Sequence, residues 1–155
     1  MRALGIDPGD VRIGVAGSDV LGILAHPLET VAAQPLERAF IRIGEIADQR
    51  QAEIIVVGLP VREDGTEGTA AEKSRRFAAG LMQELPPHLV LAFQDEYGST
   101  QVAAAQLRAA GRRIHTQRAI IDQAAAVVIL QTWMDAHAAK NQPPMHDDQA
   151  SFMNH

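Results

Sequence analysis

Short β-prone runs flank a turn near the start of the chain, and longer stretches with apolar residues at every third or fourth position follow. Ala3 to Asp7 and Arg12 to Ser18 lie on either side of a Pro-Gly turn, which predicts an antiparallel pair of strands. Pro8 lacks a backbone donor and Gly9 tolerates positive φ, so the first strand should end before them. A third strand is predicted over His26 to Val31.

Alternating helical and strand patterns come next. The continuous β-branched run Glu53 to Gly58 predicts a central strand that is covered on both faces, and Leu89 to Gln94 is predicted to form another buried strand. Pro35 opens one helix, and Thr69 with Glu72 forms a capping-box pattern that starts another. The predicted buried stripe of the first helix consists of Leu36, Phe40, Ile43 and Ala47.

Two further helices are predicted towards the carboxyl end. One covers Val102 to Ala110, capped by Ser99 or Thr100 and closed by Gly111. The other runs from about Ile120 to Ala138, and its expected inner face is Ile121, Ala125, Val128, Ile129 and Thr132. The order of elements predicts one α/β domain over residues 1–139, with a mixed five-stranded sheet and helices on both faces. Residues 140–155 have no apolar period and are expected to form a disordered tail.

Composition narrows the class of protein. The absence of cysteine excludes disulfides, thiolate metal sites and cysteine nucleophiles, and it agrees with a cytoplasmic location. No segment approaches the ~20 apolar residues of a membrane span. The net charge of −5 argues mildly against a nucleic-acid partner. Local basic clusters offset this argument: Lys73, Arg75 and Arg76 in one segment, and Arg112, Arg113, His115 and Arg118 in another.

Acidic residues stand at three places where functional groups of α/β proteins are often found. Asp7 ends the first strand, and it shares a face with small residues only, which predicts open space beside it. Asp95 and Glu96 end the fifth strand, and because side chains alternate only one of them can face the same way as Asp7. Asp122 is expected in the first turn of the last helix. A turn-forming role for Asp7 and a favourable helix-dipole interaction for Asp122 are the ordinary structural alternatives.

Together these carboxylates indicate a metal site. Three of them at one edge of the sheet would repel one another unless some were protonated or a cation lay between them. A ligand set of oxygen atoms favours Mg²⁺ or Mn²⁺. Two such ions could clamp the attacking and leaving oxygens of a phosphodiester, which predicts a nuclease.

Four sequence blocks also carry a family resemblance: GIDPGDVRIGVAGSD, IIVVGLPVREDGTEG, DEYGST and IDQAAAVVILQ. They resemble the YqgF/RuvX family, bacterial proteins of the ribonuclease H-like fold related to the RuvC resolvases. The resemblance implies that Asp7, Glu96 and Asp122 form the acidic triad, and so selects Glu96 over Asp95. It also implies maturation of the 5′ end of precursor 16S rRNA, or resolution of Holliday junctions. Many relatives have Arg after the Asp-Glu pair, where this chain has Tyr97, and this difference bears on substrate preference.

Further residues are expected to contact the nucleic acid: Gly9, Arg12, Thr66, Arg112, Arg113 and Arg118. Turn, hairpin and solvent-exposed roles are the alternatives for these residues. Two other classes of protein remain open. An actin-like or sugar-kinase-like ATPase would also grip phosphate with an Asp-x-Gly turn, but it needs two copies of the fold. A ribosome-assembly factor would bind RNA without cutting it. A homodimer is expected if the protein resolves symmetric junctions.

Overall fold

The computed structural model describes residues 2–96 and 114–141. The chain begins with three strands and then alternates helices with strands, before a long helix completes the described part. The elements are β1 (Ala3–Asp7), β2 (Arg12–Ser18), β3 (Ala25–Ala32), α1 (Leu36–Gln49), β4 (Ile54–Leu59), α2 (Thr69–Glu84), β5 (Val90–Asp95) and α4 (Ile114–Asn141).

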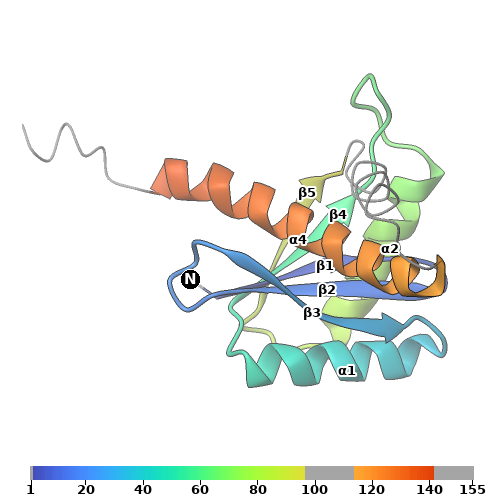
Figure 1. Ribbon diagram of the computed structural model, residues 1–155, viewed down its shortest axis with the longest axis horizontal. Coiled ribbons are helices and arrows are strands. Elements are labelled where there is room, and N and C mark those ends of the chain that lie inside the picture. Colours follow the sequence, from blue (N-terminus) through green and yellow to red (C-terminus); the bar gives the residue numbers. More distant parts are fainter. Residues whose placement is uncertain (1, 97–113, 142–155) are drawn as a thin grey trace, which may run out of the picture.

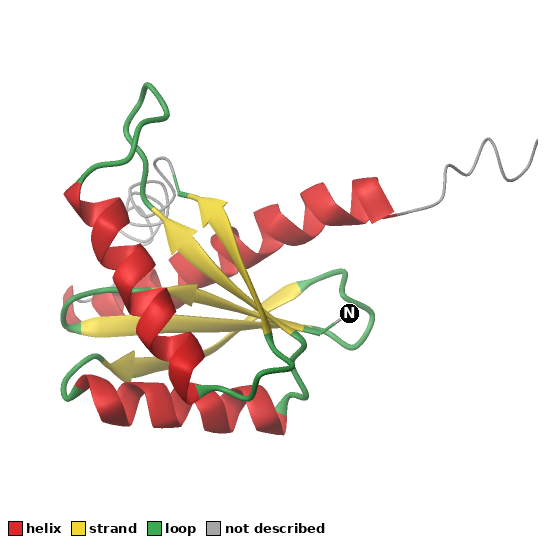
Figure 2. Ribbon diagram, turned by 180° about the vertical axis from the view of Figure 1, so that it is seen from behind, coloured by secondary structure: helices red, strands yellow, loops and turns green. Residues whose placement is uncertain are grey.

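The strands form one mixed sheet in the order β3-β2-β1-β4-β5. β1 pairs antiparallel with β2 and parallel with β4, and β4 pairs parallel with β5. Helix α4 crosses one face of the sheet (Figure 1), whereas α1 and α2 cover the other (Figure 2). Because β1, β4 and β5 run in the same direction, their carboxyl ends meet at one edge of the sheet, where α/β proteins usually place ligands.

Each face of the sheet has its own core. Towards α1 and α2 the sheet contributes large, fully buried side chains. Towards α4 it contributes mainly small ones, which pack against Ala126, Ile129, Leu130, Trp133 and Met134. No helix within residues 2–96 and 114–141 is long and apolar enough to cross a membrane.

The structure confirms the predicted order of elements within the described residues and corrects several details. β5 is an edge strand whose Val90 is 56% exposed, so the prediction of a buried strand there is wrong. Gly68 is the N-cap of α2 and no side-chain capping bond forms, so the capping box at Thr69 is wrong. Leu36 is 39% exposed because it stands at the start of α1, outside the buried stripe.

Helix α4 differs most from its prediction. It begins at Ile114, so Asp122 lies well inside the helix and the helix-dipole explanation for this residue is removed. Ala125 and Ile129 are buried as predicted, but Val128 and Thr132 are exposed. The buried positions are instead Ala125, Ala126, Ile129, Leu130, Trp133 and Met134. The predicted helix over 102–110 and most of the predicted tail lie outside the described residues.

Candidate active site

Asp7 and Glu96 meet at the edge where β1, β4 and β5 end. Asp7 is the last residue of β1. Glu96 follows β5 directly, and its backbone N–H donates to the carbonyl oxygen of Leu59 at 2.9 Å, which extends the pairing with β4. The Glu96 side chain lies over Gly58, where a Cβ atom would stand only 2.5 Å from Glu96 Oε2. The lack of a side chain at Gly58 therefore makes room for this carboxyl group.

A hydrogen bond joins the side chains of Asp7 and Glu96, and it shows how strongly the two carboxyl groups interact. Burial, followed by the negative charge of Glu96 and this hydrogen bond, raises the pKa of Asp7 to about 9. The charge of Asp122 raises it further. In the metal-free protein Asp7 and Glu96 thus share a proton at neutral pH.

Asp122 reaches the same edge from α4. The α4 backbone comes so close to β2 that a Cβ atom at Gly14 would collide with the carbonyl oxygen of Asp122. Arg12 Nε donates to Asp122 Oδ2 at 2.9 Å, and both side chains are partly buried. Burial raises the pKa of Asp122, while the hydrogen bond from Arg12 opposes this rise. Arg12 therefore supplies a positive charge to one of the three acids.

The donor chemistry of this cluster fits a hard divalent cation. All the candidate donors are carboxylate oxygens, the ligands that Mg²⁺ and Mn²⁺ prefer, and a cation between Asp7 and Glu96 would replace the shared proton. Within the described residues, however, no group of three or more His, Asp or Glu side chains is already arranged to hold a metal ion. The charges of Glu96 and Asp122 both act on Asp7, and Asp122 is also hydrogen-bonded to Arg12.

A family model described as "RuvX: Holliday junction resolvase" matches residues 1–136. The chain belongs to the RuvX family. The resemblance inferred from the four sequence blocks is therefore confirmed.

Relatives in the RuvX family align with most of this chain. A protein of Synechococcus sp. (strain JA-2-3B'a(2-13)) is 42% identical over 139 residues, which cover 90% of this chain and 81% of the relative. A protein of Nocardia farcinica (strain IFM 10152) is 46% identical over 144 residues, covering 89% of this chain and 79% of the relative. Both are named "Putative pre-16S rRNA nuclease".

Solved structures confirm the predicted fold class. Thermus thermophilus RuvC superposes with a TM-score of 0.53 at 18% identity, covering 90% of this chain and 97% of RuvC. The fowlpox virus Holliday junction resolvase gives 0.54 at 13% identity, covering 88% and 99%. At these identities the likeness concerns the fold, which is the α/β, ribonuclease H-like arrangement expected from the sequence.

The residues expected to contact nucleic acid lie in different places. Gly9 is in the β1–β2 turn next to Asp7; its φ is not positive, and a side chain there would collide with the carbonyl oxygen of Arg12. Arg12 lies at the site, but it is bound to Asp122. Thr66 is in the loop between β4 and α2 that protrudes above α2 (Figure 1), and its hydroxyl donates to Asp64 Oδ1 at 2.6 Å. Its observed contacts are thus internal to that loop.

The basic residues before Asp122 are only partly described. Arg112 and Arg113 lie outside the described residues. Arg118 belongs to α4, although the helix was predicted to start only at about Ile120, and its side chain is not among those described.

Sequence reasoning missed the glycines that shape the site. Gly5 shares the face of Asp7, but the space expected beside it is filled by α4, since a Cβ there would lie 2.6 Å from Leu130 Cβ. Gly14 and Gly58 likewise admit Asp122 and Glu96. The available signal was a glycine within each of three predicted strands, because a glycine inside a strand often marks a close approach of another backbone or group.

Proposed function

We propose that this chain is a metal-dependent endonuclease that hydrolyses phosphodiester bonds in the 5′-end maturation of precursor 16S rRNA. The observation that supports it best is the hydrogen-bonded pair Asp7–Glu96, with Asp122 nearby, at the carboxyl edge of the sheet. A buried, protonated carboxyl pair is costly to retain, and it has a clear use as a site that exchanges its proton for a cation. The names of the RuvX relatives supply the substrate class.

The three acids have separate roles in this proposal. Asp7 is central, because it interacts with both of the others, and it would lose its proton on binding a cation. Glu96, fixed by its backbone bond to β4 and by the space over Gly58, would hold the cation together with Asp7. Asp122, which accepts a hydrogen bond from Arg12, would also hold the cation. Bound Mg²⁺ or Mn²⁺, two ions in the full complex, would activate water and stabilise the charge that develops on the phosphate.

Residues 1–139 would form the nuclease domain, with 140–155 outside it. Gly9 and Arg12 would lie nearest the scissile phosphate, since both are next to the acids. Thr66, on its protruding loop, and Arg112, Arg113 and Arg118 would contact the substrate farther from the cut.

Resolution of Holliday junctions is the second candidate, because the matching family model carries that description. Both activities use the same acids, and they differ in the nucleic acid that reaches them. A single experiment with a panel of substrates therefore tests both.

The test is cleavage of end-labelled precursor 16S RNA, single-stranded RNA and four-way DNA junctions, with Mg²⁺, Mn²⁺ or chelator. Asp7→Asn removes the central charged ligand, so we expect it to lower the cleavage rate on the order of 10³-fold or more. Asp48→Asn, at an exposed position of α1, is the matched control and should cleave normally. The preferred substrate decides between the two activities. Tight RNA binding without cleavage under any condition would contradict the proposal and indicate an assembly factor.

A further inference from the structure

A groove lies beside the candidate active site, on the opposite face of the sheet. It has a volume of about 660 Å³ and is formed by the β1–β2 turn, the start of α1 and one side of α2. The acids lie on the face that packs against α4, so the turn of Pro8, Gly9 and Asp10 separates them from the groove. Because this turn follows Asp7 directly in the chain, a strand bound at the acids can pass over it into the groove.

The floor of the groove is apolar and partly aromatic. Phe40 and Phe77 meet edge to face there, with ring centroids 5.5 Å apart. Gly80 leaves space above the floor of the groove, since a Cβ at this position would lie 3.2 Å from the Phe40 ring. Leu36, the residue that proved to be exposed at the start of α1, forms part of the rim. Such a surface suits a flat, apolar group such as a nucleobase.

One wall of the groove carries positive charge. Lys73 and Arg76 both line it from α2, and both are exposed. Asp10 is the single acidic residue among the lining residues, and Lys73 Nζ lies 3.7 Å from its Oδ2. At 58% and 83% side-chain exposure this ion pair is weak and open to exchange. Lys73 can therefore exchange Asp10 for a phosphate at little cost.

We propose that this groove binds an unpaired nucleotide of the substrate RNA adjacent to the cleavage site, with its base on the Phe40–Phe77 floor and its phosphate at Lys73 and Arg76. This inference rests on the proposed nuclease function. An unpaired strand is required because a base can reach the floor only when it is splayed out of a helix. The groove thus selects RNA that is single-stranded next to the cut, which deepens the proposal for precursor rRNA over a fully paired junction.

The test measures RNA binding in the Asp7→Asn background, so that cleavage does not interfere. The probe is a fluorescent unpaired RNA of roughly ten nucleotides, compared with the same sequence in a duplex and with a free nucleoside monophosphate. We expect Lys73→Ala/Arg76→Ala to reduce the slope of log affinity against log salt by about 1.4, because each contact with a single strand contributes about 0.7. Filling the groove with Ala70→Trp should lower affinity for the unpaired RNA about tenfold.

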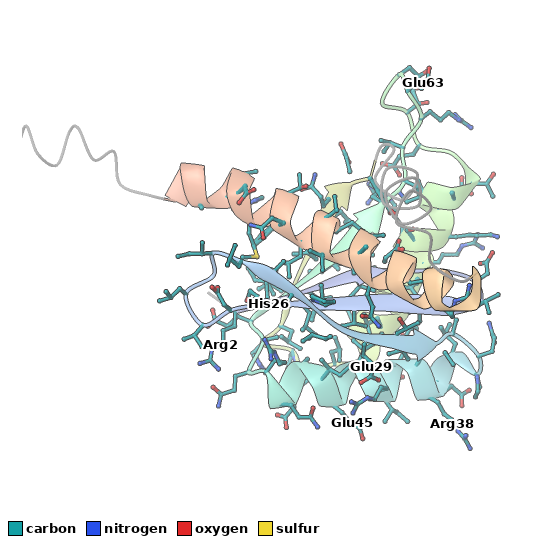
Figure 3. The ribbon with its side chains drawn as sticks, viewed as in Figure 1. Arg2, His26, Glu29, Arg38, Glu45 and Glu63 are labelled. Carbon is teal, nitrogen blue, oxygen red and sulfur yellow. The ribbon has the colours of Figure 1, made fainter. Side chains whose placement is uncertain are left out.

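Matched controls come from outside the groove. Ala79→Trp places the same large side chain on an exposed part of α2, and Arg38→Ala removes a charge that projects away from the sheet below α1 (Figure 3). Both should bind RNA within about twofold of the parent. Duplex binding should be insensitive to Ala70→Trp.

Three outcomes would overturn the inference. They are unchanged RNA affinity in both groove variants, equal losses in groove and control variants, and a nucleoside monophosphate that binds as tightly as the RNA. The nuclease proposal is judged separately, by cleavage with the original Asp7 in place. If that protein cuts RNA and the groove variants cut and bind equally well, the groove inference alone fails.

Discussion

The two faces of the sheet differ in the residues that they present to the helices. Towards α1 and α2 the strands present large aliphatic side chains, all fully buried: Leu4, Ile6, Ile13, Val15, Ile55 and Val57. Towards α4 the same strands present Gly5, Gly14 and Gly58, each of which leaves no room for a Cβ atom. The first face buries apolar area, and the second brings a helix backbone and a carboxyl group against the sheet.

This difference shows that one face of the sheet mainly stabilises the fold, whereas the other holds the candidate active site. Large buried side chains supply most of the hydrophobic stabilisation, at about 25 cal/mol for each Å² buried. The face towards α4 gives up part of that gain at its glycines, and it also carries the protonated pair Asp7–Glu96. Substitutions on the face towards α4 test this separation, and for two of them a matched position in α1 is the control.

Gly14→Ala should have the largest effect. The new Cβ would collide with the backbone carbonyl of Asp122, which cannot move without displacing α4. We expect a loss of about 3 kcal/mol in the free energy of unfolding, at the upper end for overpacking. Cleavage should be lost as well, because Asp122 shifts. Urea titration and the cleavage assay measure the two effects.

The control for Gly14→Ala is Gly44→Ala in α1. Its new Cβ would meet only Leu85 Cδ2 at 3.3 Å, the far end of a flexible side chain. Alanine is favoured over glycine in a helix by about 1 kcal/mol, so this variant should be as stable as the parent or slightly more stable. Equal stability of the two variants would show that α4 does not constrain the sheet in this way.

Asp7→Asn should have the next largest effect. Unlike Gly14→Ala, it should increase the free energy of unfolding of the metal-free protein. The folded pKa of Asp7 is about 9, against 3.8 for the unfolded chain, so between these values the folded state binds the extra proton. Stability of the metal-free protein therefore falls as pH rises from about 4 to 9. Asn cannot ionise, so the variant should keep its stability across this range and exceed the parent at pH 8 by a few kcal/mol.

Thermal unfolding in chelator at several pH values from 5 to 9 tests this expectation. Mg²⁺ or Mn²⁺ should raise the melting temperature of the parent and leave that of the Asp7→Asn protein nearly unchanged, because only the parent has a site to fill. Parallel pH profiles for the two proteins would refute the raised pKa.

The sequence predicted one face of the sheet better than the other. The short β-prone runs on either side of the Pro-Gly turn gave β1 and β2 at their observed bounds, because such runs and the turn are local signals. α4 was harder to predict, because residues 114–119 carry no apolar stripe that would mark the start of the helix. Two residues that were predicted on its buried face, Val128 and Thr132, are therefore exposed in the structure.

The candidate active site, too, could be predicted only in part from the sequence. Asp7 interacts with both Glu96 and Asp122, but their joint role as a metal-binding triad stays a prediction, and spacing alone did not choose between Asp95 and Glu96. The hydrogen bond from Arg12 to Asp122 joins residues that are 110 positions apart. No local pattern encodes such a contact; it arises only when α4 packs on β2.

Arg12→Gln should have the smallest of the three effects, and it compares ion pairs on the two faces. Arg12 binds Asp122 at the candidate metal site, whereas Arg42 binds Glu29 from α1 through two bonds of 2.8 and 2.7 Å. Removing the Arg12 charge relieves its repulsion of an incoming cation, worth about 1 kcal/mol for charges a few ångströms apart in water. We expect the Mn²⁺ affinity, measured by calorimetry without nucleic acid, to rise about fivefold.

Arg42→Gln should leave Mn²⁺ binding unchanged, because its partner lies on the opposite face of the sheet from Asp122. If Arg12→Gln weakens Mn²⁺ binding instead, Arg12 serves chiefly to hold Asp122 in place for the ion. The ion pairs on both faces would then have the same role, which is to fix the position of a carboxylate.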